Sequence, residues 1–162
     1  MAYVIAAVAL LLVISPVMWM MPSPAQRRQA RLRSRAAQLG LQVRLGELPQ
    51  TRRQRVRREP ARQGVSYRLP IYGRPELFDG EYRLCREQAG AAWEAEPERT
   101  LAPALAAALD SATATVPADV VAIDLTPQGP ALWWSERGDE RTVDAIAAQL
   151  QVLAQAQLSA AA

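Results

Sequence analysis

The sequence predicts an N-terminal transmembrane helix followed by a small α+β domain, a mostly antiparallel sheet with two or three helices packed on one face. Residues 2–21 contain no charged side chain, which is typical of a membrane span. Several later segments alternate apolar with polar side chains, the pattern of half-buried strands. Residues 140–158 place their apolar side chains on one helical face. About 100 residues remain for the domain, enough for one modest core.

The anchor at residues 1–22 is predicted from its length and its flanks. Its twenty uncharged residues, 2–21, at about 1.5 Å each, span roughly the 30 Å hydrocarbon core. A cleaved signal peptide is the main alternative, but such peptides begin with a basic region and have a shorter apolar run. In this chain no lysine or arginine precedes the run, and arginines follow it.

The arginines after the span predict its orientation. Five of them lie within about 15 residues of its end: Arg27, Arg28, Arg31, Arg33 and Arg35. The positive-inside rule then places the N-terminus in the periplasm and the C-terminal domain in the cytoplasm of a bacterial inner membrane. A bacterial source with a GC-rich genome is indicated because lysine and asparagine, whose codons are A-rich, are both absent.

The composition excludes many kinds of active site. All nineteen basic residues are arginine, histidine is absent, and Cys85 is the single cysteine of the 162 residues. Histidine bases, Ser-His and Cys-His pairs, Schiff-base lysines and the lysine of a phosphate-binding loop therefore cannot occur in this chain. One thiol cannot supply a Cys/His zinc site. We expect a protein that is not an enzyme and has no cofactor and no metal.

The net charge of +3 hides two unlike parts. Residues 25–62 carry twelve arginines and two glutamates, a net charge of +10, whereas residues 63–162 carry seven arginines and fourteen acids, a net charge of −7. This asymmetry indicates contact with an anionic surface. We divide the chain into the anchor, a basic juxtamembrane helix and strand (23–48), an Arg-rich loop (49–64) and an α+β cytoplasmic domain (65–162).

The juxtamembrane segment has its own pattern. Ser23 and Pro24 are good helix-starting residues, and Gly40 is placed to end the helix. Residues 41–45 then alternate as a strand. This helix and strand either belong to the folded domain or lie against the membrane.

Three roles compete for the Arg-rich loop: binding of anionic headgroups, binding of RNA or the ribosome, and a solvated loop that only enforces topology. Anionic lipids suit arginines that an anchor already holds near the leaflet. No aromatic residue is interleaved to stack on a base, so we expect no specific nucleic-acid binding. The expected contacts with anionic headgroups of membrane lipids are Arg27, Arg28, Arg31, Arg35, Arg52, Arg53, Arg57 and Arg58.

The C-terminal part alternates strand and helix signals. Strands are predicted over 65–72, 81–86 and 92–94, and a hairpin is predicted over 119–135 around the turn 126–130. Pro70 makes the first of these strands an edge candidate. Thr100 can cap a helix over 101–109, and a final helix is predicted over 140–158.

Two adjacent tryptophans are the candidate partner contacts. Trp133 and Trp134 fall on one predicted strand, so their side chains must point to opposite faces. One can enter the core, while the other faces solvent, a covering helix or a partner. An exposed tryptophan is a common interface anchor.

Acidic residues give the only candidate for catalysis. Glu94, Glu96 and Glu98 recur at every second position and would share one face of a strand, and Asp124 interrupts an apolar strand. Such acids can bind a divalent cation or act as an acid/base pair. Pro97 breaks the strand, however, and a solvated edge is the simpler interpretation.

The layout of the first 45 residues resembles that of the YajC family, a small auxiliary subunit of the bacterial preprotein translocase. The resemblance rests on one N-terminal helix, a very short outer segment and a basic continuation. The family's Gly-Asp and Gly-Gly motif is missing, because residues 39–47 read LGLQVRLGE, and everything from Val65 onward differs. The chain looks more like single-pass inner-membrane proteins of GC-rich proteobacteria that are grouped with that family by default, and no functional residue is carried over.

Together these observations predict a membrane-anchored cytoplasmic interaction protein, an accessory subunit of an inner-membrane complex. Its expected partners are anionic lipids and another membrane protein, with no small-molecule substrate. A metal-dependent hydrolase using Glu94, Glu96 and Asp124, and a tether for RNA or ribosomes through residues 52–62, are the alternatives.

Overall fold

The computed structural model describes residue 3, residues 23–72 and residues 80–160. The predicted transmembrane segment therefore lies outside the described residues, apart from Tyr3. None of the helices in the described ranges has both the length and the apolar character that a bilayer crossing requires. The chain divides into two compact units, Met1–Arg31 and Leu32–Ala162, and the second unit holds the folded domain.

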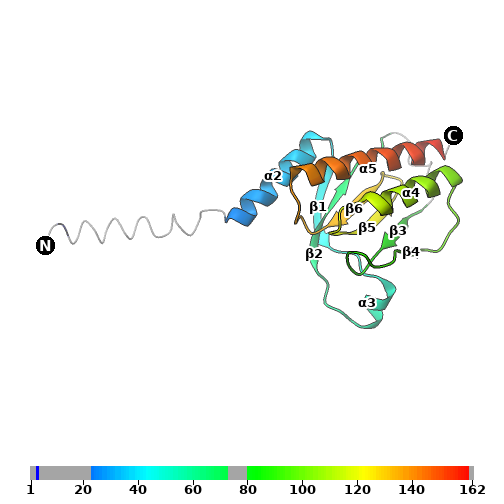
Figure 1. The fold of residues 1–162 in the computed structure, drawn as a ribbon, viewed down its shortest axis with the longest axis horizontal. Helices are drawn as coiled ribbons and strands as arrows, with labels where there is room; N and C mark the ends of the chain where they lie inside the picture. Colours follow the sequence, from blue (N-terminus) through cyan, green and yellow to red (C-terminus); the bar gives the residue numbers. More distant parts are fainter. Residues whose placement is uncertain (1–2, 4–22, 73–79, 161–162) are drawn as a thin grey trace. The chain divides into compact units, whose positions relative to one another are not determined.

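The domain is built on one six-stranded sheet whose neighbouring strands are all antiparallel (Figure 1). The strand order is β1-β2-β6-β5-β3-β4. The strands are β1 (Gln42–Glu47), β2 (Gln63–Arg68), β3 (Tyr82–Cys85), β4 (Glu94–Glu96), β5 (Val120–Leu125) and β6 (Ala131–Trp134). The predicted α+β class and antiparallel sheet are confirmed.

Four helices accompany the sheet in the described residues: α2 (Pro24–Gln38), α3 (Arg52–Val56), α4 (Pro103–Thr115) and α5 (Glu140–Ser159). The ribbon shows α4 and α5 side by side over the same face of the sheet (Figure 1). Buried side chains of α2, α4 and α5 join those of the strands in one core cluster. Leu32 and Ala36 place the C-terminal half of α2 in that cluster. The helix and strand at 32–47 are thus part of the folded domain, which settles the alternative that the sequence left open.

Helices α4 and α5 follow from their sequences. Asp139 accepts a hydrogen bond from the backbone N–H of Thr142, and the Thr142 hydroxyl accepts one in return from the backbone N–H of Asp139, so α5 begins with a capping box. The predicted final helix is confirmed to within one residue. Helix α4 runs well past the predicted end at residue 109, because its alanine-rich sequence continues to Thr115 and Pro117 follows shortly after.

Two segments differ from the expectations. Strand β2 ends at Arg68, before Pro70, and it lies between β1 and β6, so the prediction of an edge strand is wrong. The strand pattern of 65–72 continues in sequence, but Pro70 has no N–H to donate to a ladder. Within 49–64, expected to be a loop, the structure contains α3 and the start of β2. The reason is a second capping box, in which the Thr51 and Gln54 side chains each bond the other's backbone N–H.

The register assigns a side-chain row to each face of the sheet. Directly paired residues share a face, so Tyr67, Leu132, Ile123 and Leu84 form a row on the face that the core cluster covers. Trp134 lies in the next row of that face, is fully buried, and meets the Tyr67 ring edge-on at 5.2 Å and 78°. The opposite face, which we call the second face, carries the polar residues described next.

Candidate binding surface on the second face of the sheet

A row of alternating charges crosses the second face of the sheet. Glu96 on β4 pairs with Arg83 on β3, and Arg83 pairs with Asp124 on β5. Arg68 on β2 occupies the same row two strands further, beyond Ala131 of β6. We call Glu96, Arg83, Asp124 and Arg68 the charge ladder. Four different strands contribute one member each, so the antiparallel register alone places them in one row, with Ala131 between Asp124 and Arg68.

The centre of the ladder is a forked ion pair. The Arg83 Nε and NH2 groups donate to the two oxygens of Asp124 at 2.6 and 2.8 Å. Asp124 is buried, while Arg83 keeps part of its side chain in solvent. The hydrogen bond to Asp124 raises the pKa of Arg83 above its usual range, and burial of the guanidinium opposes this effect.

Trp133 completes the partners of Asp124. Its indole N–H donates to Asp124 Oδ2 at 2.8 Å, and its ring lies over Gly46 of β1, where an added Cβ would come within 3.4 Å of the ring. Trp133 is half-buried on the second face, whereas Trp134 is fully buried in the core. The predicted opposition of the two tryptophans is confirmed. Trp134 is therefore ruled out as a partner contact, and Trp133 stays a candidate.

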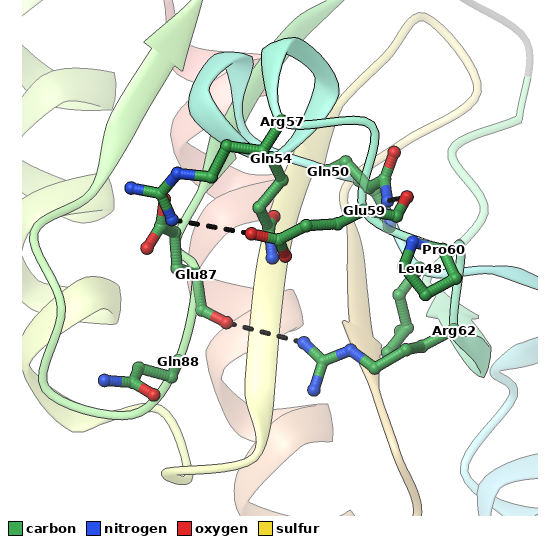
Figure 2. Close-up of a pocket in the computed structure, with 10 residues that line it drawn as sticks. Leu48, Gln50, Gln54, Arg57, Glu59, Pro60, Arg62, Glu87 and Gln88 are labelled. Carbon is green, nitrogen blue, oxygen red and sulfur yellow. Dashed lines mark hydrogen bonds and ion pairs between the residues drawn. The ribbon is translucent and has the colours of Figure 1, made fainter.

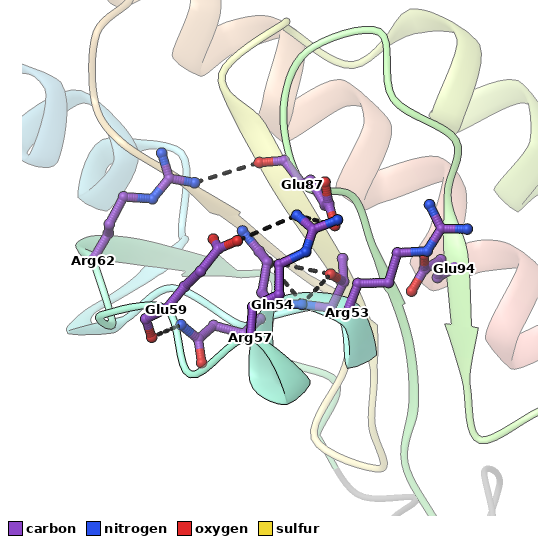
Figure 3. Close-up of polar contacts among 9 residues, drawn as sticks. Arg53, Gln54, Arg57, Glu59, Arg62, Glu87 and Glu94 are labelled. Atoms are coloured by element: carbon purple, nitrogen blue, oxygen red, sulfur yellow. Dashed lines mark hydrogen bonds and ion pairs between the residues drawn. The ribbon is translucent and has the colours of Figure 1, made fainter.

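The acids of β4 lie near arginines of α3. Arg55 NH2 lies 2.5 and 2.6 Å from the Glu96 oxygens. Arg53 Nε lies 3.8 Å from Glu94 Oε1 (Figure 3). Glu94 and Glu96 thus face guanidinium groups. Within the described ranges, no group of three His, Cys, Asp or Glu residues is arranged to hold a metal ion.

The rest of the Arg-rich segment borders a polar cavity of about 410 Å³ (Figure 2). Arg57 lies 3.4 Å from Glu59 and 3.9 Å from Glu87, and Arg62 NH2 donates to the Glu87 carbonyl oxygen at 3.4 Å. Both signs of charge line this cavity, together with Gln50, Gln54 and Gln88. Its local charges are therefore largely compensated within the domain.

The predicted lipid contacts fall into three groups. Arg27, Arg28 and Arg31 are exposed on the first half of α2. Arg35 pairs with Asp144 at 2.8 Å, and Arg53 and Arg57 have the acidic neighbours given above. Arg52 and Arg58 are exposed and form no ion pair within the described part of the chain. Lipid contact by these eight arginines stays a prediction.

Cys85 sits beneath α3 on the second face. It is buried, and it lines a cavity of about 560 Å³ together with Thr51, Trp93 and Glu94. Burial raises the pKa of this thiol to about 12, so the thiol is protonated at neutral pH. A protonated, buried thiol is a poor nucleophile.

A buried acid that joins α2 to the sheet could not be identified from the sequence. Glu136 is 1% exposed and accepts hydrogen bonds from Arg33 Nε at 3.0 Å, Arg33 NH2 at 2.6 Å and the Tyr67 hydroxyl at 2.9 Å. Its φ of 54° is the left-handed conformation, which is rare for a residue with a side chain. Spacings of 69 and 103 residues separate these partners in sequence, and no local pattern reveals them.

A second buried charge holds the turn before β5. Arg86 is 7% exposed and donates to the carbonyl oxygens of Val120 at 2.7 Å, Pro117 at 2.9 Å and Ala118 at 3.2 Å. Its guanidinium carbon lies 4.5 Å from the centroid of the Trp93 ring. Arg86 therefore has a structural role, because its donors are used by the turn.

The ladder ends in unmatched positive charge at the β2–β1 side. Arg44 on β1 lies on the second face beside Arg68, since Arg44 pairs with Ser66 in the adjacent row. Burial and the charge of Arg44 lower the pKa of Arg68, and the charges of Asp124 and Glu81 oppose this effect. Arg68 Nε is buried without an acceptor among the described residues, and its NH1 reaches only Gln128, at 3.4 Å. No acid of the described chain forms an ion pair with either arginine.

Comparison of the chain with models of known protein families, with curated proteins and with solved structures finds no match.

Proposed function

We propose that this chain is a membrane-anchored cytoplasmic interaction protein that serves as an accessory subunit of a bacterial inner-membrane complex. The observation that carries the proposal is the uncharged run of residues 2–21 followed at once by five arginines. On this proposal the anchor supplies location and the α+β domain supplies the binding surface. The arginines of α2 are then the first candidates for contact with anionic headgroups.

The polar chemistry of the domain supports a binding role. Asp124 and Glu96, which an acidic hydrolase would need, are engaged by Arg83 and Arg55, and Glu94 has Arg53 nearby. Guanidinium groups at these distances occupy the oxygens that a divalent cation would require. The hydrolase alternative therefore has no arrangement to support it in the described residues.

The RNA-tether alternative also lacks a specific observation in its favour. It needs several arginines that are free to meet phosphates, and Arg53, Arg55 and Arg57 of the 52–62 segment already have acidic neighbours within 4 Å. Arg52 and Arg58 are exposed without an ion pair among the described residues, but they have no aromatic residue in sequence beside them. Stacking on bases would require an exposed aromatic side chain beside them. Trp93, the aromatic of the nearby cavity, is instead covered by Arg86.

Membrane location and orientation can be tested directly in a bacterial host. With a reporter on the C-terminus, we expect the full chain in the membrane fraction, resistant to carbonate extraction, with the reporter active only on the cytoplasmic side. A variant that places two arginines within residues 2–21 is the control and should lose the membrane fraction. Full recovery of the natural chain in the soluble fraction would refute the proposal.

The binding role needs a second measurement in the same membranes. A photo-crosslinking residue is placed at exposed Leu45, near the unmatched arginines, and a matched one at exposed Val152 on α5. We expect a discrete adduct with a second membrane protein at native expression. Adducts limited to lipid at both positions would contradict an accessory-subunit role.

A further inference from the structure

The strand that carries Arg44 is an edge of the sheet. Within the described residues β1 pairs with β2 alone, so its other side presents backbone N–H and C=O groups that no strand uses. Leu45, at its middle, is 70% exposed. An open edge with an exposed leucine is the arrangement to which an extended segment can add.

The two faces of this edge strand favour different side chains on any strand that pairs with it. Gln42 and Arg44 point to the second face, next to Arg68, whereas Val43 and Leu45 belong to the rows of the core face. A strand added beside β1 continues those rows by one position. On one face its carboxylates would lie beside Arg44 and Gln42, with Arg68 one strand further in, and on the other face its apolar side chains would cover Leu45.

The charge ladder itself favours a carboxylate as the missing partner. Arg83 has a carboxylate on each neighbouring strand, Asp124 and Glu96, and Arg55 of α3 bonds the same Glu96. Arg68 lies beyond Asp124, whose two oxygens are already used by Arg83 and Trp133. The next position along the row, outside β1, is the first at which a further acid could be placed.

A second copy of this chain cannot supply that acid through its own β1. In an antiparallel β1–β1 pair centred on Arg44, the two Arg44 side chains would face each other directly. Centred on Leu45, the pair would set Arg44 opposite Gly46 and leave the two arginines as diagonal neighbours. Glu47 projects to the other face, with Val43 and Leu45, and so reaches neither arginine.

We propose that the β1 edge binds an extended segment of a partner protein in which acidic residues alternate with apolar residues. The segment adds as a seventh strand, its acids beside Gln42 and Arg44 on the face that also carries Arg68 one strand further in, and its apolar side chains covering Leu45. The inference rests on the proposed binding role and names the chemistry of the partner.

The test uses the full chain in neutral detergent micelles and a synthetic eight-residue peptide of alternating glutamate and valine. Binding is measured by calorimetry and by hydrogen exchange of the β1 amides. We expect slower exchange in β1, and affinity that falls as salt is raised. Arg44→Gln should weaken binding about tenfold, the loss expected for one charge-assisted hydrogen bond, and Arg68→Gln, one strand further in, should weaken it by a smaller factor.

Matched controls separate this surface from general charge attraction. Arg141→Gln removes an exposed arginine on α5 and should leave peptide affinity unchanged. Leu45→Ser should weaken binding, whereas Val152→Ser, on the exposed face of α5, should not. A peptide with lysine in place of glutamate should not bind. If Arg68→Gln fails to fold, exposed Arg44 and Leu45 still provide the test.

Several results would overturn the inference. They are absence of peptide binding, equal binding of the lysine peptide, equal losses in Arg44→Gln and Arg141→Gln, and protection confined to segments other than β1. Self-association that protects β1 without peptide would identify a second copy as the occupant instead. Arginine-dependent binding to anionic vesicles but not to the peptide would identify lipid. A membrane adduct unaffected by Arg44→Gln would leave the accessory role standing and refute this surface alone.

Discussion

Replacing Arg33 by methionine tests whether the buried acid at the α2–sheet junction depends on its guanidinium partner. The substitution keeps a long apolar side chain but removes the Nε and NH2 donors from which Glu136 accepts, while the hydrogen bond from the Tyr67 hydroxyl stays. Removing one partner of a buried ion pair costs about 3–5 kcal/mol. Because the Arg33 side chain is 32% exposed, we expect a smaller loss of about 2–3 kcal/mol in the free energy of unfolding.

The size of the thermal effect follows from the size of the domain. A folded unit of roughly 130 residues has an unfolding entropy of about 0.27 kcal/mol per kelvin, so the melting temperature should fall by about 7–11 °C. Circular dichroism of the full chain in micelles measures it. Arg35→Met, two residues along the same helix, removes an ion pair whose partners are both solvent-exposed and should change little. Adding Glu136→Gln to Arg33→Met should restore part of the stability. Equal shifts for Arg33→Met and Arg35→Met would refute this reasoning.

Three further predictions concern the sheet. Asp124→Asn should lower the free energy of unfolding by about 2–3 kcal/mol in denaturant titrations, because Arg83 loses its carboxylate partner. Glu96→Gln, at an exposed ion pair, should lower it by less than about 1 kcal/mol. Equal losses in the two variants would contradict the central role of the Arg83–Asp124 pair. Gly129→Ala should lower the free energy of unfolding by more than about 2 kcal/mol, since its φ is +114° and a Cβ would overlap the Leu69 carbonyl oxygen. Gly90→Ala, where the added Cβ meets open space, should lower it by about 1 kcal/mol. Thermal melts that rank the two variants the other way would contradict this reasoning. Cys85 should react with a thiol reagent only as fast as the domain opens, and rapid labelling of the native protein would show the thiol to be accessible. Because the pKa of Cys85 is raised in the folded state, its contribution to the free energy of unfolding should be present below about pH 8.5 and lost as the pH rises toward 12.

Helices and strands could be predicted from the sequence where capping residues, turn residues or an apolar periodicity mark them within one segment. Helix α5 has a capping residue and a sustained apolar face, and the hairpin of β5 and β6 has turn residues between two apolar runs, so the predicted bounds match closely. Helix α3 was missed because its five residues bury only Gln54 and so leave no apolar periodicity to detect.

The strand order and the binding surface lay beyond a reading of single segments. Arg83 and Asp124 are 41 residues apart, and so are Arg55 and Glu96. Nothing in the spacing of charges indicates which acid each arginine will meet, because that depends on which strands become neighbours. Asp124 was marked by its place in an apolar strand, yet its role as a partner of Arg83 and Trp133 required the register. For Trp133 and Trp134 the sequence predicts only that their side chains point to opposite faces, because alternation does not say which of the two enters the core.

The ladder also bears on how the sheet finds one alignment among several. All six residues of β5 are buried, so the usual alternation of solvent-exposed and buried side chains does little to specify the register of this strand. Asp124 provides it: sliding β5 against β3 by two residues would bring this acid opposite Glu81 in one direction and Cys85 in the other. The first shift places two negative charges opposite each other, and the second leaves a buried carboxylate beside a thiol, without its arginine partner. A single acid in an apolar strand thus penalises misaligned sheets during folding, so loss of Asp124 should increase the share of chains that misfold or aggregate, beyond its effect on the native state.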